Sequence, residues 1–298
     1  MTIGILIFSK PHDDAFSGSD RLVEAGQAAG FTTIKLYEPH LSFVDGNIFH
    51  EGQPFPPVDV IIVRPNFVEE PSLRTYAVQM LAETGTRIIN GNVGFTWAKN
   101  KLTQHVLFAK HDLPCPRWGI ARKPEDAVAV AKEIGFPAII KVAFGTHGKG
   151  VFLAKDEETL WPIADYLAIR DRNPLIIEEF IQEARSTDIR AFVIGGKVVG
   201  AMMRTAAEGD VRANTSNRGT GSVGELSKDE TDLAIKAAEV FGLEIAGVDL
   251  IRSKRGTLIL EVNSNPGFKE LEAVTNLDIA RMIIDYAASV ESCLESRM

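Results

Sequence analysis

Two short stretches near the end of the sequence decide the fold: Gly247-Val-Asp-Leu-Ile251 and Leu260-Glu-Val-Asn-Ser-Asn-Pro-Gly267. Both begin as apolar strands, yet Asp249 lies inside the first and Glu261 inside the second. Because successive side chains of a strand point to opposite faces, Glu261 and Asn263 share one face. The two stretches therefore indicate a sheet whose strands carry polar side chains for a purpose other than packing.

A hairpin between these strands would bring the polar side chains together. If residues 254–256 form a three-residue loop with Gly256 in the left-handed conformation, Asp249 lies directly opposite Glu261. Like charges so placed repel each other unless a cation lies between them. Two carboxylates and the amide of Asn263 are hard oxygen donors, which suit Mg²⁺ or Mn²⁺ held together with nucleotide phosphates. The open alternative is an exposed sheet face with ordinary polar residues.

A glycine-rich loop, residues 145–150, has the pattern Gly-x-x-Gly-x-Gly with Gly148 at its centre. Glycines let backbone N–H groups approach a phosphate closely. The loop connects two expected strands, so it differs from nucleotide loops that open a helix, and a plain tight turn is the alternative. Lys141, at the end of the preceding apolar strand, needs an anionic partner because burial of a lone ammonium is costly. A phosphate is the favoured partner, and a structural carboxylate remains open.

The apolar strand at residues 175–181 becomes acidic at Glu178 and Glu179 and aromatic at Phe180. This pattern is typical of an interdomain hinge that places adenine between apolar walls and backbone polar groups. An edge strand with solvated glutamates is the alternative.

Basic side chains gather in and beside a long polar stretch, residues 205–221: Arg204, Arg212 and Arg218, with Asn214 between them. Arginines bind carboxylates and phosphates through two hydrogen bonds. Loops of this length are usually functional or disordered. A solvated loop is the alternative to an anion-binding loop.

Bulk properties exclude several classes of protein. The 298 residues suffice for two or three packed units, and the net charge of −8 argues against direct nucleic-acid binding or a polybasic membrane anchor. The two cysteines form no disulfide framework or metal cluster, and the six histidines show no metal-ligand spacing. The apolar N-terminus is short, so we expect a cytoplasmic protein with no membrane segment.

The order of predicted elements indicates α/β and α+β organisation in three parts. Strands and helices alternate over residues 1–95, which predicts a parallel α/β domain with a hairpin at Asp45-Gly46. Residues 96–184 read as a central α+β subdomain that begins with one helix, 98–111. Residues 185–298 read as a C-terminal α+β subdomain with a hairpin at Gly195-Gly196 and the polar strands described above.

Taken in order, these signals resemble the ATP-grasp superfamily, and most closely its RimK-type branch, the ribosomal-protein glutamate ligases. The residues that carry the resemblance are Lys101, Lys141, the glycine loop, Glu179-Phe180, Asp188-Ile-Arg190, Arg212-Ala-Asn214, Asp249 and Glu261-Val-Asn263. The resemblance covers essentially the whole chain and is strongest over residues 101–267. The strings Glu208-Gly-Asp-Val-Arg-Ala-Asn214 and Glu261-Val-Asn-Ser-Asn-Pro-Gly267 are specific to this kind of ligase.

The resemblance implies an ATP-grasp fold, in which a pre-ATP-grasp α/β domain precedes two α+β subdomains that enclose ATP. It implies two ions of Mg²⁺ or Mn²⁺ held by Asp249, Glu261 and Asn263, and catalytic roles for Arg212 and Arg204. The implied ATP contacts are Lys101, Lys141 and Gly148 at the phosphates, Glu179 and Phe180 at adenine, Asp188 at the ribose, and Arg212 and Asn214 near the transferred phosphate.

The implied activity is ADP-forming ligation of a carboxylate to an amine through an acyl phosphate, with L-glutamate or a related amino acid added to the C-terminus of a ribosomal protein. We also expect a homo-oligomer. Phe144 and His147 lie where more polar residues are expected, and Thr205 follows Arg204 where the ribosomal modifiers often carry a second arginine. These departures leave open a small-molecule or carrier-protein acceptor, as in dipeptide, cofactor glutamyl or amino-group-carrier ligases. A non-catalytic nucleotide-binding regulatory module is the other alternative.

Overall fold

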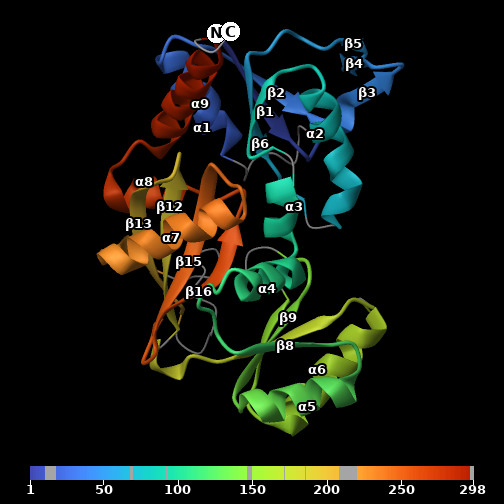
Figure 1. Cartoon of the computed structure of the whole chain (residues 1–298), viewed down its shortest axis with the longest axis vertical. Coiled ribbons are helices and arrows are strands. Elements are labelled where there is room, and N and C mark those ends of the chain that lie inside the picture. The colour runs from blue at the N-terminus through green and yellow to red at the C-terminus, as the bar shows by residue number, and fades with distance from the viewer. Residues whose placement is uncertain are drawn as a thin grey trace.

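The computed structural model describes residues 1–10, 18–67, 70–91, 93–145, 150–170, 172–184, 186–207 and 220–295. In this part of the chain the strands form a parallel sheet and three antiparallel sheets, which confirms the predicted mixture of α/β and α+β organisation. Figure 1 shows the parallel sheet at the top, the five-stranded sheet in the middle and the remaining four-stranded sheet at the bottom.

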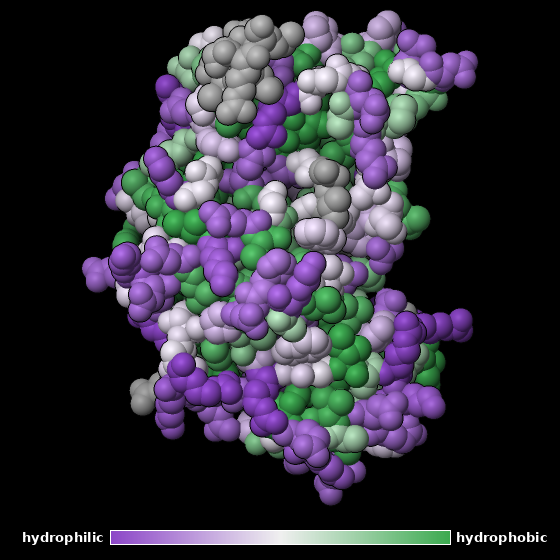
Figure 2. All heavy atoms as spheres, viewed as in Figure 1, coloured by the Kyte–Doolittle hydropathy of each residue, from purple (hydrophilic) through white to green (hydrophobic). Residues whose placement is uncertain are grey.

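A helix that crosses a membrane must be long and largely apolar. None of them combines the length and the apolar character that a membrane crossing needs. Hydrophilic and hydrophobic residues are interspersed on the face of the molecule that Figure 2 shows.

The parallel sheet has the order β2-β1-β6-β7 and forms the core of the N-terminal part. Side chains of β1 and of Phe8, the residue after it, alternate between two layers: Ile3, Ile5 and Ile7 pack with helices α1 and α9, whereas Leu6 and Phe8 pack with α2. The helix at the C-terminal end of the described chain therefore covers one face of the first sheet (Figure 1). The elements are β1 (Thr2–Ile7), α1 (Ser19–Ala28), β2 (Thr32–Tyr37), β6 (Val60–Arg64), α2 (Thr75–Ala82), β7 (Arg87–Ile89) and α9 (Ile279–Glu295).

The predicted hairpin at Asp45-Gly46 is confirmed. It joins β3 (Leu41–Val44) to β4 (Asn47–His50), and the short β5 (Gln53–Pro54) extends the sheet. Asp45 and Gly46 have φ values of 47° and 82°. A two-residue turn with both φ values positive matches the twist of the strands that it joins.

The central sheet is antiparallel with the order β10-β9-β11-β8. Helices α5 and α6 cover one face and bury Ala138, Ile140 and Ile177. Figure 1 places α4 on the opposite side of β8 and β9 from these helices. The elements are β8 (Trp118–Ala121), α5 (Pro124–Ile134), β9 (Ala138–Val142), β10 (Val151–Ala154), α6 (Glu157–Arg170) and β11 (Leu175–Glu179).

The C-terminal sheet has five antiparallel strands in the order β14-β13-β12-β15-β16. Ala191 and Val193 of β12 pack with α7 on one face, whereas Phe192 and Ile194 pack with the residues of α8 and α9 on the other. The predicted two-residue hairpin turn at Gly195-Gly196 is confirmed, since Ile194 pairs with Lys197. The elements are β12 (Thr187–Ile194), β13 (Lys197–Thr205), β14 (Thr220–Val223), α7 (Lys228–Val240), β15 (Ile245–Ser253), β16 (Gly256–Asn263) and α8 (Lys269–Thr275).

The prediction of one helix over residues 98–111 was wrong. The structure has two helices, α3 (Val93–Lys99) and α4 (Lys101–Lys110), separated at Asn100. Asn100 adopts an extended conformation, and its side-chain oxygen accepts hydrogen bonds from the N–H groups of Leu102 (3.0 Å) and Thr103 (3.3 Å). Asparagine caps a helix N-terminus in this way, so a new helix, α4, begins at Lys101. In the predicted single helix, Lys101 would instead lie in the helix interior.

The predicted register of the last hairpin is confirmed, but the predicted loop was wrong. Asp249 does lie opposite Glu261. The turn has two residues rather than three, because Ser253 pairs with Gly256, and Gly256 has a φ of 105°. A β-bulge between Asp249 and Leu250 supplies the one-residue shift that the loop was expected to supply.

We predict that Glu230→Gln destabilises the protein by about 1–2 kcal/mol at pH 7, because Glu230 closes a capping box at α7 and binds a charged partner. Its carboxylate accepts hydrogen bonds from the Ser227 N–H (2.9 Å) and from Arg252 (2.7 Å). These bonds lower the pKa of Glu230 to about 2, and the bond from Arg252 has the largest effect. A lowered pKa stabilises the fold above the ordinary pKa of 4.5, and that stabilisation is lost as the pH falls towards 2. The measurement is urea unfolding of both proteins between pH 7 and pH 3.

The matched control is Asp229→Asn, which changes an exposed acid in the same helical turn. Equal losses of stability for the two variants, or a Glu230→Gln effect that grows as the pH falls, would contradict the assignment.

Candidate functional site

The three predicted metal ligands lie on one face of two neighbouring strands. Asp249 of β15 and Glu261 of β16 are direct Cα partners, and Asn263 is paired with Gly247. The amide nitrogen of Asn263 lies 3.5 Å from Asp249 Oδ2 and 3.4 Å from the Gly247 carbonyl oxygen. Val248, Leu250 and Val262 lie on the α7 side of the sheet, so the polar trio faces away from that helix.

Cationic side chains hold both carboxylates of this trio. Arg190 donates to both oxygens of Asp249, with 2.7 Å between Nη2 and Oδ2, and Arg204 Nη2 lies 3.0 Å from the same Oδ2. Burial raises the pKa of Asp249, but the two arginines more than offset this effect and lower it to about 2. Lys101 Nζ lies 3.0 Å from Glu261 Oε1 and 3.3 Å from the Gly145 carbonyl oxygen.

Arg204 lies in β13 and is buried, with 4% of its side chain exposed. The expectation of a basic loop with Arg204 as a member was therefore wrong for this residue. It donates from Nε and Nη2 to the two oxygens of Asp188, at 2.7 and 2.8 Å. The neighbouring carboxylates raise the pKa of Arg204 although burial alone would lower it. Asp188, the predicted ribose residue, thus has both oxygens engaged by an arginine from the adjacent strand.

Lys141 has a carboxylate partner, the second of the two possibilities that the sequence left open. Its Nζ lies 2.5 Å from Oε2 of Glu178, whose side chain is 2% exposed. Burial raises the pKa of Glu178, but Lys141 and His105 more than offset this effect and lower it to about 2. The alternative of an edge strand with solvated glutamates was wrong, because β11 lies between β9 and β8.

The predicted adenine hinge lies at the end of β11. Glu179 Oε2 accepts from the Arg117 N–H (3.2 Å) and also contacts the guanidinium of Arg255, which lies in the turn between β15 and β16. This pair joins the central sheet to the C-terminal sheet. Phe180 follows directly and is partly buried. The predicted residues Gly148, Arg212 and Asn214, like His147, lie outside the described residues.

The donor set of Asp249, Glu261 and Asn263 suits a hard divalent cation, since all three side chains carry oxygen donors on one surface. The cationic partners carry as much positive charge as the acids carry negative charge: Asp188, Asp249 and Glu261 face Arg190, Arg204 and Lys101. A metal ion would therefore share these carboxylates with the protein's own cations.

A histidine cluster that the sequence spacing did not reveal lies in the N-terminal part. Ligand atoms of His40, His50 and Glu51 lie within 4.8 Å of one another. His50 Nε2 accepts the Tyr37 N–H (3.1 Å), and His40 Nδ1 lies 3.1 Å from Glu51 Oε1. The lone pair of His50 Nε2 is thus already used, and we interpret the cluster as a clamp on the β3–β4 hairpin.

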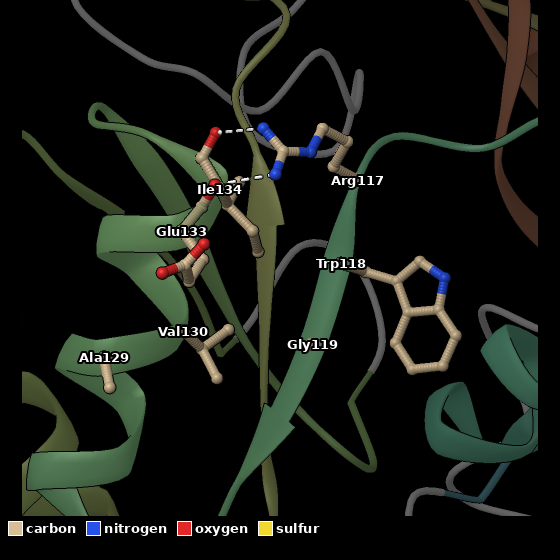
Figure 3. A pocket seen from close by; sticks show the side chains of 7 residues that line it. All are labelled: Arg117, Trp118, Gly119, Ala129, Val130, Glu133 and Ile134. Atoms are coloured by element: carbon tan, nitrogen blue, oxygen red, sulfur yellow. Dashed lines mark hydrogen bonds between the residues drawn. The ribbon is translucent and has the colours of Figure 1, made fainter.

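A shallow hollow of about 410 Å³ lies between β8 and α5, and none of the predicted metal ligands lines it. Figure 3 shows that Arg117 closes its upper rim through hydrogen bonds to the carbonyl oxygens of Glu133 and Ile134. Val130 and Glu133 line it from the helix. In the same view the ring of Trp118 lies on the other side of β8 from Val130, towards α4.

Comparison with known proteins decides the family. Residues 98–287 match the model of the RimK-like ATP-grasp domain. The chain belongs to the RimK-like ATP-grasp family. It is 36% identical to a protein named probable alpha-L-glutamate ligase from Marinomonas sp. (strain MWYL1), over 89% of each chain. It is also 36% identical to the protein of that name from Klebsiella pneumoniae (strain 342), over 92% of this chain and 94% of the relative.

Solved structures agree on the fold. The ATP-grasp ligase PsnB, in a complex with a minimal precursor, superimposes with a TM-score of 0.74 at 21% identity and covers 96% of this chain and 98% of its own. The D-cycloserine synthetase DcsG superimposes with a TM-score of 0.73 at 16% identity, over 98% and 100% of the two chains. The RimK-like chain is therefore an ATP-dependent ligase with the ATP-grasp fold.

Three residues beside the predicted site residues of this RimK-like chain were not given roles from the sequence: Arg190, Glu178 and His105. Arg190 and Glu178 stood within strings that had been quoted, and the two-residue period of a strand places Arg190 on the face of Asp188. His105 follows Lys101 by one helical turn, so it lies on the same side of α4. The signal for Arg190 and His105 was their periodicity relative to a predicted site residue.

We predict that Arg204→Gln destabilises this RimK-like ligase by about 3–5 kcal/mol, because the change leaves two buried carboxylates short of a counter-charge. Urea unfolding measures the loss. Arg281→Gln is the control, because Arg281 pairs with Asp285 where both side chains are about half exposed, and such pairs contribute about 1 kcal/mol or less. A loss for Arg204→Gln no larger than the control would contradict the buried network.

Proposed function

We propose that the chain is an alpha-L-glutamate ligase that adds L-glutamate to the C-terminus of a ribosomal protein through an acyl phosphate. The observation that carries the proposal is the convergence of Asp249, Glu261 and Asn263 from two strands with Lys101 from α4. This arrangement offers oxygen donors for a metal and an ammonium for phosphate in one place. The name of the curated relatives supports glutamate as the amino acid.

The proposed ATP site lies between the central and C-terminal sheets. Lys101 and Lys141 contact the phosphates with the glycine loop at Gly148, Glu179 and Phe180 hold adenine, and Asp188 holds the ribose. Asp249, Glu261 and Asn263 hold two ions of Mg²⁺ or Mn²⁺, which neutralise charge on the phosphates. The solved structure of PsnB with Mg and ADP supports the choice of magnesium.

The proposed reaction has two steps. An oxygen of the acceptor carboxylate attacks the γ-phosphorus of ATP, and ADP leaves as the acyl phosphate forms. The amine of glutamate then attacks the carbonyl carbon, phosphate leaves, and the amine loses a proton. Positioning and charge neutralisation supply most of the catalysis, so no side-chain nucleophile is required. Arg204 and Arg212 act here by stabilising the negative charge of the acyl phosphate.

A peptide acceptor is supported by two solved relatives of the fold. PsnB and the macrocyclase MdnC were each determined with a precursor peptide. The net charge of −8 favours approach to a basic ribosomal partner. We expect the active protein to be a homo-oligomer.

The experiment that tests the proposal is phosphate release from ATP and Mg²⁺, measured across single amino acids with and without ribosomal protein. We expect release that requires both glutamate and the protein acceptor, with a mass increase of the acceptor. Release with free amino acids alone would move the assignment to a peptide ligase. Bound ATP without release under any condition would favour a regulatory module.

We predict that Glu261→Ala lowers ATP turnover by at least about a hundredfold, because it removes a carboxylate that would hold the metal ion compensating the negative charge of the transferring phosphoryl group. Phosphate release measures turnover, and thermal unfolding checks that the fold persists. Glu239→Ala, at an exposed position of α7, is the control and keeps full turnover. Full activity of Glu261→Ala would overturn the proposed metal site.

A further inference from the structure

A buried carboxylate lies between a lysine ammonium and a histidine ring beneath the proposed phosphate site. Glu178 Oε2 lies 2.5 Å from Lys141 Nζ, and Glu178 Oε1 lies 2.9 Å from His105 Nε2. The exposed fractions of the three side chains are 2%, 12% and 3% in the order Glu178, Lys141, His105. The trio comes from three elements, β11, β9 and α4, and lies on the sheet face opposite α5 and α6.

Both ring nitrogens of His105 face oxygen atoms that only accept hydrogen bonds. Nδ1 lies 2.8 Å from the carbonyl oxygen of Lys101, and Nε2 lies beside the carboxylate of Glu178. Glu178 Oε1 accepts no hydrogen bond from the described residues, so its contact with Nε2 is one of charge, and only the imidazolium, which has a proton on each nitrogen, places a positive charge beside this oxygen. The rings of Trp118 and Phe108, with centroids 5.0 and 5.7 Å away, enclose the imidazole. Figure 3 shows the Trp118 ring on this side of β8.

The charge of His105 changes what the trio presents to a nucleotide. Lys141 and Glu178 alone cancel, and a neutral pair attracts phosphate weakly. With the imidazolium, two positive charges share one negative charge, so the trio keeps a net charge of about +1 in a region of low dielectric constant. Cys115, the nearby ionisable thiol, adds no charge, because burial raises its pKa to about 11.

His105 also connects the two lysines that we propose as phosphate contacts. It bonds to the backbone of Lys101, whose ammonium reaches Glu261, and through Glu178 it reaches Lys141. The first turn of α4 and the end of β9 are therefore tied together by one imidazole and one carboxylate.

We propose that His105 is a positioning residue that sets the net charge around Lys141 and holds Lys141 in place at the nucleotide phosphates. The proposal rests on the proposed placement of ATP beside Lys141, and it does not depend on the amino acid or the acceptor. Removing the imidazolium should leave Lys141 neutralised by Glu178 and weaken nucleotide binding. Removing the Glu178 charge as well should release Lys141 again.

The test is calorimetric titration of the purified protein with AMPPNP and Mg²⁺. His105→Leu and His105→Gln are each expected to raise the dissociation constant on the order of tenfold, the size of one unscreened charge interaction across a partly buried site. The double variant His105→Leu with Glu178→Gln should return to within about threefold of the wild-type value. His111→Leu, the same change at the other end of α4, should leave binding unchanged.

Thermal unfolding of every variant shows whether a change in affinity reflects loss of the fold, and His105→Gln keeps the test available if the leucine variant unfolds. A residue that only packs would give no recovery in the double variant, and that outcome, or unchanged affinity in both single variants, would overturn the proposal. Failure of wild-type protein to bind AMPPNP would overturn it together with the ATP site. Normal binding and recovery without glutamate transfer would instead refute only the proposed function.

Discussion

Buried carboxylates are the constraint on which the rest of the structure depends. Asp188, Asp249 and Glu178 are 9%, 6% and 2% exposed. An unpaired carboxylate in such a place costs several kcal/mol, so each must meet a cation from another strand or helix. The positions of Arg190, Arg204 and Lys141 follow from this requirement, because the chain can bury its acids only where those side chains arrive.

Helix α4 contacts both the C-terminal sheet and the buried carboxylate of the central sheet. Gln104 exchanges hydrogen bonds with the backbone of Val262, donating from Nε2 to the carbonyl oxygen (3.1 Å) and accepting the N–H at 2.8 Å. The next residue, His105, contacts Glu178 of the central sheet. The helix is thus fixed to β16 by neutral amide bonds and to β11 by charge. Any movement between the two sheets has to be accommodated by one of these two attachments.

Much of the fold could be predicted from local pattern. The strand alternation of the first part and the hairpins at Asp45-Gly46 and Gly195-Gly196 all depend on neighbours in sequence or on a strict two-residue period. The family resemblance was confirmed by the match to the RimK-like model. The boundaries at residues 95 and 184 and the individual site roles stay predictions.

What could not be predicted depended on contacts between distant residues or on fine backbone geometry. The break at Asn100 lies inside a stretch whose pattern predicts one helix, because one asparagine lowers helix stability only a little. Its role as a cap is evident only from the hydrogen bonds that its side chain accepts. The bulge beside Asp249 has no sequence signature and was mistaken for a longer loop. The partner of Lys141 lies on another strand, and the sequence could predict only that this partner carries a negative charge.

The packing of α9 on the first sheet has a consequence for the order of events in synthesis. Ile3, Ile5 and Ile7 bury their side chains against a layer that includes Ile279, Ile283 and Ile284. While the chain emerges from a ribosome, the first sheet is complete once residue 89 has appeared, yet of the two helices on this face only α1 has been made, and α9 follows nearly two hundred residues later. The N-terminal part of this protein therefore completes its packing late in synthesis. A chaperone or the unfinished neighbouring sheet must shield the apolar surface that α9 later covers.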